Sequence, residues 1–474
     1  METVGWEQAT ARRMARHGLE RPVARAELAR QAGVVCGIHA QVMGAAELSL
    51  ALRVEGATRA DVRAALWEEQ TLVKTYGPRG TVHLLPADEL AGWIAALGAI
   101  PVPESPLPDG VRFDERQHSE VIAAIGDALA DAELTTDELT EALVARCGAW
   151  VGERSMPAFQ QQWPRWRQAT VAAAHAGALC FGAPRGRAVT FTNPRRLVAA
   201  FDSALTAARE ATAAERWAGG AGAGEPRAGR GGGVGAAGAG GAGAGEPRAG
   251  RGGGVGAERA GGAGAGEPRA GRGAGAGAER AGGALGDRDD AGRAVTPALA
   301  ALVRRWLAAY GPATAAQFAQ WAAAPRAWAG ELFAALDGAG ELTAISFEGE
   351  PAWVASGDDA FPDAAPDSVR LLPYYDAYGI GCHPRERLFP GRAAERALAR
   401  GQAGPFPLLL LDGVVGGVWH QRRSGRSVVV TVEPLRRLGA ARRAALAEQV
   451  ERLGAIVAAS PSLTIGAVRV GPHA

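Results

Sequence analysis

The chain is almost without lysine. Lys74 is the only lysine among its 51 cationic residues, and all the others are arginine. Codon bias in a GC-rich genome is sufficient to explain this composition. Its physical consequence is that every cationic contact but one is made by a planar guanidinium, which matches the geometry of phosphate oxygens. The formal net charge is only +1, so the overall charge balance does not indicate a nucleic-acid partner.

Cysteines and long apolar runs are also scarce. The four cysteines are scattered, and none lies in a CxxC motif or at ligand spacing from a histidine. This pattern predicts neither disulfides nor a metal site, and it is typical of a reducing cytoplasm. No stretch approaches the roughly 20 apolar residues that span a bilayer, and the N-terminus lacks the apolar core of a signal peptide. We therefore expect a cytoplasmic protein with no membrane partner.

Glycine, in contrast, is concentrated in one insert. Residues 217–293 consist almost wholly of glycine, alanine, arginine and glutamate, and "GAGEPRAG" recurs with a period of 21 from Gly222, Gly243 and Gly264. A segment without an apolar face cannot offset its ordering entropy, so we expect it to be disordered. An arginine–glycine nucleic-acid tether is one interpretation. Repeat expansion is the other, and the glutamates that cancel much of the arginine charge favour it.

The remaining segments predict an α+β protein. Three of them have the order helix, helix, helix and two-stranded wing, which is the winged-helix plan of DNA-binding proteins. We expect these domains over residues 6–100, 101–216 and 294–360. Residues 369–474 are strand-rich, and they predict a small C-terminal β-barrel-like domain or a curled sheet, with a closing helix over Leu438–Leu453. None of these spans is expected to contain a parallel sheet.

Six motifs then occur in a fixed order along the chain. They are "GIHAQ…LSLALR", "PRGTVHLLPA", "CFGAPRGRAVTF", "AYGPATAAQFAQW", "LLPYYDAYGIG" and "LLDGVVGGVWHQRR". Each motif is weak alone, but the ordered set is specific. The chain resembles the AlkZ-like and YcaQ-like DNA glycosylases over its whole length apart from the glycine-rich insert.

This resemblance implies three winged-helix domains and a C-terminal β-barrel around a concave DNA-binding face. It also implies excision of N-alkylated purines, including interstrand crosslinks and bulky natural-product adducts. The family's catalytic motif is Gln, an apolar residue, then Gln or Asp. Here it falls on His39-Ala40-Gln41, so Gln41 matches the second catalytic residue and His39 replaces the first. Such His–apolar–Gln variants look similar to members linked to antibiotic self-resistance.

The reaction expected of His39 and Gln41 needs no strong general acid. Alkylation at N7 makes a purine cationic and a good leaving group, so the enzyme must mainly place a water and stabilise an oxocarbenium-like transition state. A neutral imidazole can accept a proton from the water, and a glutamine oxygen can orient the water or face the developing sugar cation. The pair is predicted at a helix start, where positions i and i+2 do not share a face. We expect activity to fall as His39 becomes protonated near pH 6.5.

Other residues are candidates for DNA contact or for a pocket. The expected DNA-contacting residues are all arginines, at positions Arg79, Arg165, Arg167, Arg385, Arg422, Arg423 and Arg426. Asp376, Tyr378 and His383 are candidate pocket residues. A turn that caps the barrel is the alternative for Asp376 and Tyr378, and a solvated turn is the alternative for the arginines at the "HQRRSGR" hairpin tip. His83 is interpreted as structural.

The leading hypothesis is a monofunctional glycosylase for bulky N7-alkylpurine adducts, acting in antibiotic self-resistance. A lyase needs an amine for a Schiff base, and Lys74 stands where the family pattern has arginine. We expect a monomer that binds double-stranded DNA carrying alkylated purines and uses no cofactor or metal. Two alternatives stay open: a non-catalytic winged-helix DNA-binding protein, and a general repair glycosylase for simple alkylpurines.

Overall fold

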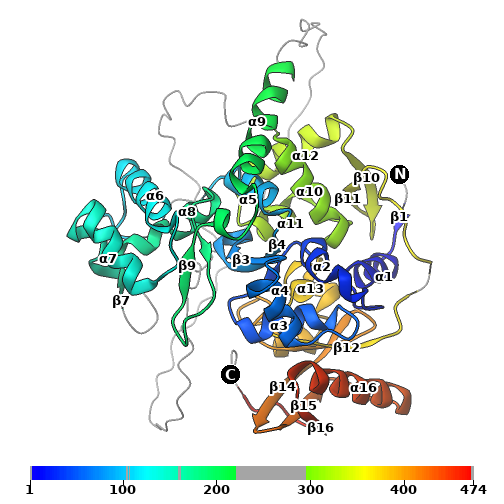
Figure 1. Ribbon diagram of the computed structural model, residues 1–474. Helices are drawn as coiled ribbons and strands as arrows, with labels where there is room; N and C mark the ends of the chain where they lie inside the picture. Colours follow the sequence, from blue (N-terminus) through cyan, green and yellow to red (C-terminus); the bar gives the residue numbers. More distant parts are fainter. Residues whose placement is uncertain are drawn as a thin grey trace, which may run out of the picture.

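A computed structural model describes residues 3–102, 105, 107–157, 162–219, 295–363 and 365–470. Almost all of the glycine-rich insert, and with it the expected disorder, lies outside the described residues. Helices and short sheets alternate along the chain, and the described residues form four units that pack against one another (Figure 1). The expected α+β class is confirmed.

The first unit carries a three-stranded sheet with the order β2-β4-β3. Its elements are η1 (Arg25–Glu27), α2 (Leu28–Val34), β2 (Ile38–His39), α3 (Met43–Leu52), α4 (Arg59–Trp67), β3 (Leu72–Tyr76), η2 (Pro78–Gly80), β4 (Val82–Pro86) and α5 (Leu90–Gly98). All five residues of β4 are buried, as expected of the central strand of a sheet covered by helices. The strand expected in "GTVHLL" is confirmed.

The second unit repeats this order with a sheet β5-β9-β8. Its elements are α6 (Glu115–Leu129), β5 (Leu134–Thr135), α7 (Thr136–Cys147), η3 (Ala149–Val151), β6 (Arg154–Pro157), β7 (Gln162–Pro164), η4 (Arg165–Ala169), α8 (Thr170–His175), β8 (Cys180–Phe181), β9 (Thr190–Thr192), η5 (Pro194–Arg196) and α9 (Phe201–Gly219). The Thr135–Glu138 capping box starts α7, because each side chain bonds a backbone N–H that the helix leaves unpaired.

The third unit includes the N-terminal end of the chain. Its elements are β1 (Thr3–Val4), α1 (Trp6–Arg16), α10 (Pro297–Tyr310), α11 (Ala315–Ala322), α12 (Arg326–Gly338), β10 (Leu342–Phe347) and β11 (Glu350–Ala355). Strand β1 adds to β10 in parallel, so the N-terminus lies beside this unit at the right of Figure 1. The buried Arg13 of α1 donates to the carbonyls of Tyr310, Pro312 and His383, which joins this helix to two distant segments.

The C-terminal unit contains a five-stranded sheet with the order β12-β13-β14-β15-β16. Its elements are β12 (Val369–Leu372), α13 (Ala377–Gly381), α14 (Arg385–Leu388), α15 (Arg392–Ala397), β13 (Leu408–Leu411), β14 (Val414–Ser424), β15 (Ser427–Pro434), α16 (Ala440–Val457) and β16 (Ser460–Ile465). Strands β12 and β16 do not pair within the described residues, so the sheet is open and the expected barrel is not closed. Strand β16 pairs with β15 in parallel, as β1 does with β10, so the expectation of no parallel pairing is wrong in both of these units.

Candidate active site

His39 lies on a strand and not at the start of a helix. After α2 the chain turns through Cys36 and Gly37, whose φ angles of 60° and 93° lie in the left-handed region, and it then enters β2. The Ala40 N–H donates to the Val82 carbonyl at 2.7 Å, and α3 begins only at Met43. The helix predicted around His39 and Gln41 is therefore wrong, because pairing with β4 keeps this segment extended.

The register of the sheet brings two histidines together. His39 is the partner of His83 on β4, which in turn is the partner of Thr75 on β3. Residues that are partners across strands share a face of the sheet. The two imidazole rings meet edge to face, with centroids 5.1 Å apart and an interplanar angle of 70°. His83 therefore neighbours the candidate catalytic residue, which its interpretation as structural did not foresee.

Tyr375 covers the His39 ring. Their centroids are 4.9 Å apart and the rings are nearly parallel, at 22°. Tyr375 lies in the turn before α13, and its N–H donates to the Gly404 carbonyl at 3.2 Å. Sequence reasoning missed this residue, although it immediately precedes Asp376 in the motif "LLPYYDAYGIG". That proximity was the only available signal, because nothing local indicates which distant ring a tyrosine will contact.

The surroundings of His39 favour its neutral form. Burial lowers the pKa of His39 well below its ordinary value of 6.5, and the nearby His83 and Arg79 lower it further. Burial and Arg79 likewise lower the pKa of His83 to about 3, although its Nδ1 lies 2.8 Å from the Thr81 carbonyl. A charged imidazole is disfavoured here because it would lose hydration and face a guanidinium. The fall in activity that is expected when His39 becomes protonated should therefore begin at a pH below 6.5.

The His39 side chain is almost fully enclosed. His39 is 8% exposed, and its Nδ1 is buried and makes no hydrogen bond among the described residues. Gln41, two residues further on, is half-buried. Of the two residues of the candidate motif, Gln41 is thus the more accessible to solvent.

Two arginines expected to contact DNA lie close to each other, and one of them, Arg79, also lies near this imidazole. Arg79, in η2, is half-buried and donates to the Trp321 carbonyl at 3.0 Å. Arg385 donates to the carbonyls of Gly379 and Ile380, and burial, followed by opposing charge effects of Cys382 and Arg79, lowers its pKa to about 10. Neither guanidinium has a carboxylate within 4.0 Å among the described residues. Partly buried cations with carbonyl partners alone retain most of their attraction for an anion.

His383 lies beside this group but is enclosed. It is 7% exposed, and its pKa falls to about 3 because of burial, Arg385 and Arg13. Its backbone carbonyl accepts a hydrogen bond of 2.6 Å from the Arg13 guanidinium. The imidazole is thus neutral and almost without solvent access, so it contributes to the scaffold behind Arg385 and does not line an open pocket.

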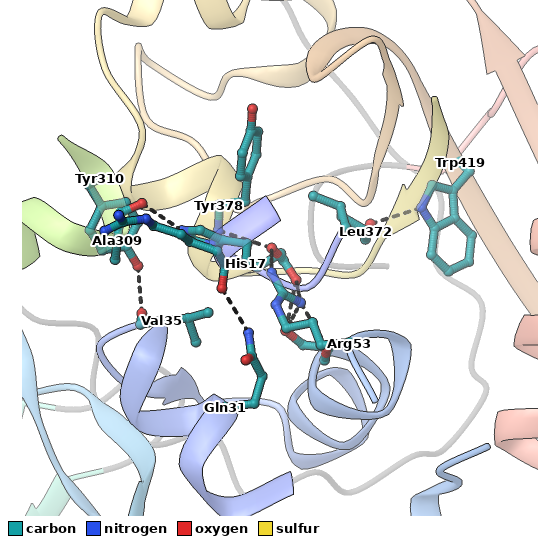
Figure 2. Close-up of polar contacts among 12 residues, drawn as sticks. His17, Gln31, Val35, Arg53, Ala309, Tyr310, Leu372, Tyr378 and Trp419 are labelled. Atoms are coloured by element: carbon teal, nitrogen blue, oxygen red, sulfur yellow. Dashed lines mark hydrogen bonds and ion pairs between the residues drawn. The ribbon is translucent and has the colours of Figure 1, made fainter. Parts of the chain in front are cut away.

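Asp376 and Tyr378 belong to a buried polar network. The Asp376 carboxylate accepts bonds of 2.8 and 2.7 Å from Arg53, another of 2.7 Å from Ser49, and one from the N–H of Tyr378. The Tyr378 hydroxyl donates to the Gly413 carbonyl at 2.9 Å. Figure 2 shows Arg53, His17 and Tyr378 gathered between the first and C-terminal units. Both candidate pocket residues are fully engaged inside the protein, and the Asp376 side chain also accepts from the Tyr378 N–H as the N-cap of α13.

The five other candidate arginines lie in two separate places. Arg165 donates to the Val111 carbonyl at 2.8 Å, and Arg167 stacks over Trp163 at 4.3 Å, so both contact their own unit. Trp166, which precedes Arg167, is fully buried in the core. Arg422, Arg423 and Arg426 are exposed around the turn between β14 and β15, which confirms the expected hairpin. Of these three, Arg423 also donates to the Val457 carbonyl at 3.1 Å.

Lys74 does not share the face of the sheet that carries His39. It is the partner of Leu84, and Leu84 is the partner of Ile38, so these three residues occupy the opposite face of β2-β4-β3. The Lys74 ammonium lies 4.4 Å from the centre of the Phe181 ring. This geometry separates the only lysine amine from the candidate catalytic imidazole.

Two kinds of site are not found in the part of the chain that the structure describes. No group of three or more histidine, cysteine, aspartate or glutamate side chains is arranged to hold a metal ion. No helix there combines the length and the apolar character needed to cross a membrane.

A family profile described as DNA glycosylase AlkZ-like matches residues 32–232 and 257–456. The chain belongs to this family of DNA glycosylases, as its ordered motifs predict.

One curated relative, an interstrand DNA cross-link repair glycosylase of Streptomyces sahachiroi, is 24% identical over 427 residues, 88% of this chain and 87% of the relative. The solved structure of the Streptomyces sahachiroi DNA glycosylase AlkZ is similar as well. It has a TM-score of 0.65 and 23% identity, and the match covers 98% of this chain and all of that one. The chain thus shares both its family and its fold with a crosslink-repair glycosylase.

Proposed function

We propose that the chain is a monofunctional glycosylase that hydrolyses the N-glycosidic bond of N7-alkylated purines in DNA, and that His39 and Gln41 perform this reaction. The observation that carries the proposal is a buried, neutral imidazole, stacked on Tyr375, at the position of the family's catalytic motif. A neutral His39 suits a substrate that is itself cationic, because a protonated imidazole would repel the alkylated base.

In this mechanism the water oxygen bonds to C1′ of the sugar while the bond from C1′ to the base nitrogen breaks. The base leaves with the electron pair, which neutralises the positive charge that alkylation placed on it. Nε2 of His39 accepts the proton that the water loses. The Gln41 amide oxygen faces the water or the sugar cation, and its partial negative charge stabilises the oxocarbenium-like transition state.

DNA binding follows from the repeated units and from the arginines. We interpret the three helical units, each with its own small sheet, as winged helices, and the C-terminal unit as a fourth DNA-contacting domain. Arg79 and Arg385, which lack carboxylate partners within 4.0 Å among the described residues, are proposed to hold the phosphates that flank the target nucleotide. The hairpin arginines supply further phosphate contacts. The protein acts in this scheme as a cytoplasmic monomer, without metal or cofactor.

The substrate is proposed to be a bulky adduct. The curated relative is named for interstrand crosslink repair, and the His–apolar–Gln motif resembles that of family members linked to antibiotic self-resistance. Two probes separate this proposal from general alkylation repair: a duplex with a single N7-methylguanine, and a duplex with a nitrogen-mustard crosslink between two guanine N7 atoms. Faster release from the crosslinked duplex supports the proposal, and release from N7-methylguanine alone supports general repair.

Single-turnover base release with the intact chain tests the catalytic assignment. We expect His39→Ala and Gln41→Ala each to slow release by about 10²–10⁴, the usual range for a positioned acid–base group, with little change in DNA affinity. His39→Gln restores the commoner motif and should retain part of the activity. His118→Ala, on α6, is the matched imidazole control.

The product also tests the proposal. A monofunctional enzyme leaves an intact abasic strand, which breaks only after treatment with hot alkali. Wild-type release by His39→Ala would disprove the catalytic role of the imidazole. DNA binding without base release from either probe would favour the non-catalytic alternative.

A further inference from the structure

The ring of Tyr375 has two close neighbours. It stacks on His39, and a Cβ added to Gly404 would lie 2.8 Å from Cδ1 of Tyr375. Any residue other than glycine at position 404 would therefore push the tyrosine ring. Gly404 also has φ +112°, a region that side chains rarely adopt. The protein thus leaves a space for this ring that only a glycine permits.

His83, the other ring that contacts His39, also has little free space around it. A Cβ added to Gly77 would lie 2.8 Å from Nδ1 of His83, and one added to Gly37 would lie 3.1 Å from Cδ2 of His83. Tyr375 and His83 both contact the His39 ring, and each is itself backed by glycine. The His39 imidazole is consequently held between rings that have little room to move.

The turn that carries Tyr375 is anchored to the helix that follows the catalytic motif. Tyr375 has φ +55°, which costs a non-glycine residue about 1–2 kcal/mol and needs support from its surroundings. The next residue, Asp376, is held by Arg53 and by the Ser49 hydroxyl. Ser49 lies on α3 and Arg53 caps its C-terminal end, so this helix connects the Tyr375 turn to the segment that bears His39 and Gln41.

We propose that Tyr375 is a positioning residue for His39: its ring sets the plane of the imidazole, keeps solvent from Nδ1 and leaves Nε2 available to the reacting water. This inference rests on the proposed catalytic role of His39. Tyr375 itself transfers no proton in this scheme, so the stacked ring matters and the hydroxyl does not.

A positioning role predicts that loss of the Tyr375 ring changes the pKa of His39, which a purely structural role does not predict. The charged or titratable groups that face His39 are His83 from β4, Arg79 from η2 and the Tyr375 phenol. Burial is the largest cause of the lowered pKa of His39. Removal of the covering ring admits water to the imidazole, so its pKa should rise toward 6.5 and the acid limb of the reaction should rise with it.

The test compares Tyr375→Phe, which keeps the stacked ring, with Tyr375→Leu and Tyr375→Met, which remove it. The first readout is the NMR titration of isotope-labelled histidines in the intact chain without DNA, where the His39 signal is the one lost in His39→Gln. The second is single-turnover release of N7-methylguanine and of the mustard crosslink as a function of pH.

We expect Tyr375→Phe to match wild type in both readouts. In Tyr375→Leu and Tyr375→Met the His39 titration should move up by about one pH unit or more, and release should slow about 10–100-fold at unchanged DNA affinity. An unchanged His39 titration in either folded variant would overturn the inference. Loss of activity in Tyr375→Phe would overturn it too, because the hydroxyl would then be required. If His39→Ala instead releases base at the wild-type rate, the proposed function fails, and that result is distinct from either outcome for Tyr375.

Discussion

At the scale of single residues, Asp376 shows how burial changes the meaning of a charged side chain. Its side chain and that of Arg53 are both 0% exposed, and the pair is bidentate. Burial alone would raise the pKa of Asp376, but the charge and hydrogen bonds of Arg53, together with those of Ser49 and Tyr378, lower it below its ordinary value. The carboxylate therefore remains ionised and holds the Tyr375 turn against α3.

Asp376→Asn should destabilise the fold strongly. The substitution leaves the Arg53 guanidinium buried without its counter-ion, which costs about 3–5 kcal/mol in comparable pairs. Urea denaturation at neutral pH measures the change in the free energy of unfolding. Glu341→Gln is the control: it breaks an ion pair with Arg304 in which both side chains are 40% exposed, and such pairs contribute about 0–1 kcal/mol. Equal effects of the two substitutions would contradict the structural role assigned to Asp376.

At the scale of elements, the β14–β15 hairpin carries proposed DNA-contacting arginines in a different sheet from the proposed catalytic residue His39. Ser424 and Ser427 are partners at its tip, and Arg422, Arg423 and Arg426 are exposed around it. The hairpin belongs to the C-terminal unit, whereas His39 belongs to a short strand of the first unit. Changes at the tip should therefore alter how tightly DNA is held and leave the chemical step unaffected.

Replacing the three hairpin arginines with alanine should weaken DNA binding and flatten its salt dependence. Each lost phosphate contact removes about 0.9 from the slope of log affinity against log salt concentration, so the slope should fall by about 2–3. Fluorescence anisotropy with an undamaged duplex measures this slope. Replacement of the same arginines with lysine keeps the charge and should keep most of the slope. An unchanged slope in the alanine variant would show that the tip does not contact the DNA backbone.

At the scale of the whole molecule, buried histidines couple stability to pH. Burial is the largest cause of the lowered pKa of four of them, to about 3 for His17, His83 and His383 and about 4 for His175. Above pH 6.5 these groups are neutral in both the folded and the unfolded chain. Below 6.5 only the unfolded chain takes up protons, so the folded state loses stability as pH falls.

The free energy of unfolding should therefore be constant from about pH 8 to 7 and fall below pH 6.5. Each such histidine contributes a slope of up to about 1.4 kcal/mol per pH unit. Urea denaturation at a series of pH values measures this dependence. His17→Gln should be less stable at neutral pH because the bond to the Ala309 carbonyl is disturbed. Below pH 6.5, however, its free energy of unfolding should fall less steeply with pH than that of wild type, because one titrating histidine has been removed. A wild-type stability that does not change between pH 7.5 and 5.5 would contradict this prediction.

Much of the order of helices and strands was determined by the sequence itself. The capping box at Thr135 and Glu138, the β14–β15 hairpin and the helices of the three units follow from apolar periodicity and hydrogen bonds between near neighbours. The motif order likewise identified the family, and it singled out His39 and Gln41 as the candidate pair.

Only the tertiary structure decided the surroundings of these residues. Pairing with β4 made the His39 segment a strand, packing of the C-terminal unit placed Tyr375 on the imidazole, and burial against Arg53 turned Asp376 from a pocket candidate into an anchor. The parallel pairing of β16 with β15 was also decided by the tertiary structure. These contacts join residues far apart along the chain. Their formation depends on how whole units pack, and no local pattern of residues encodes that packing.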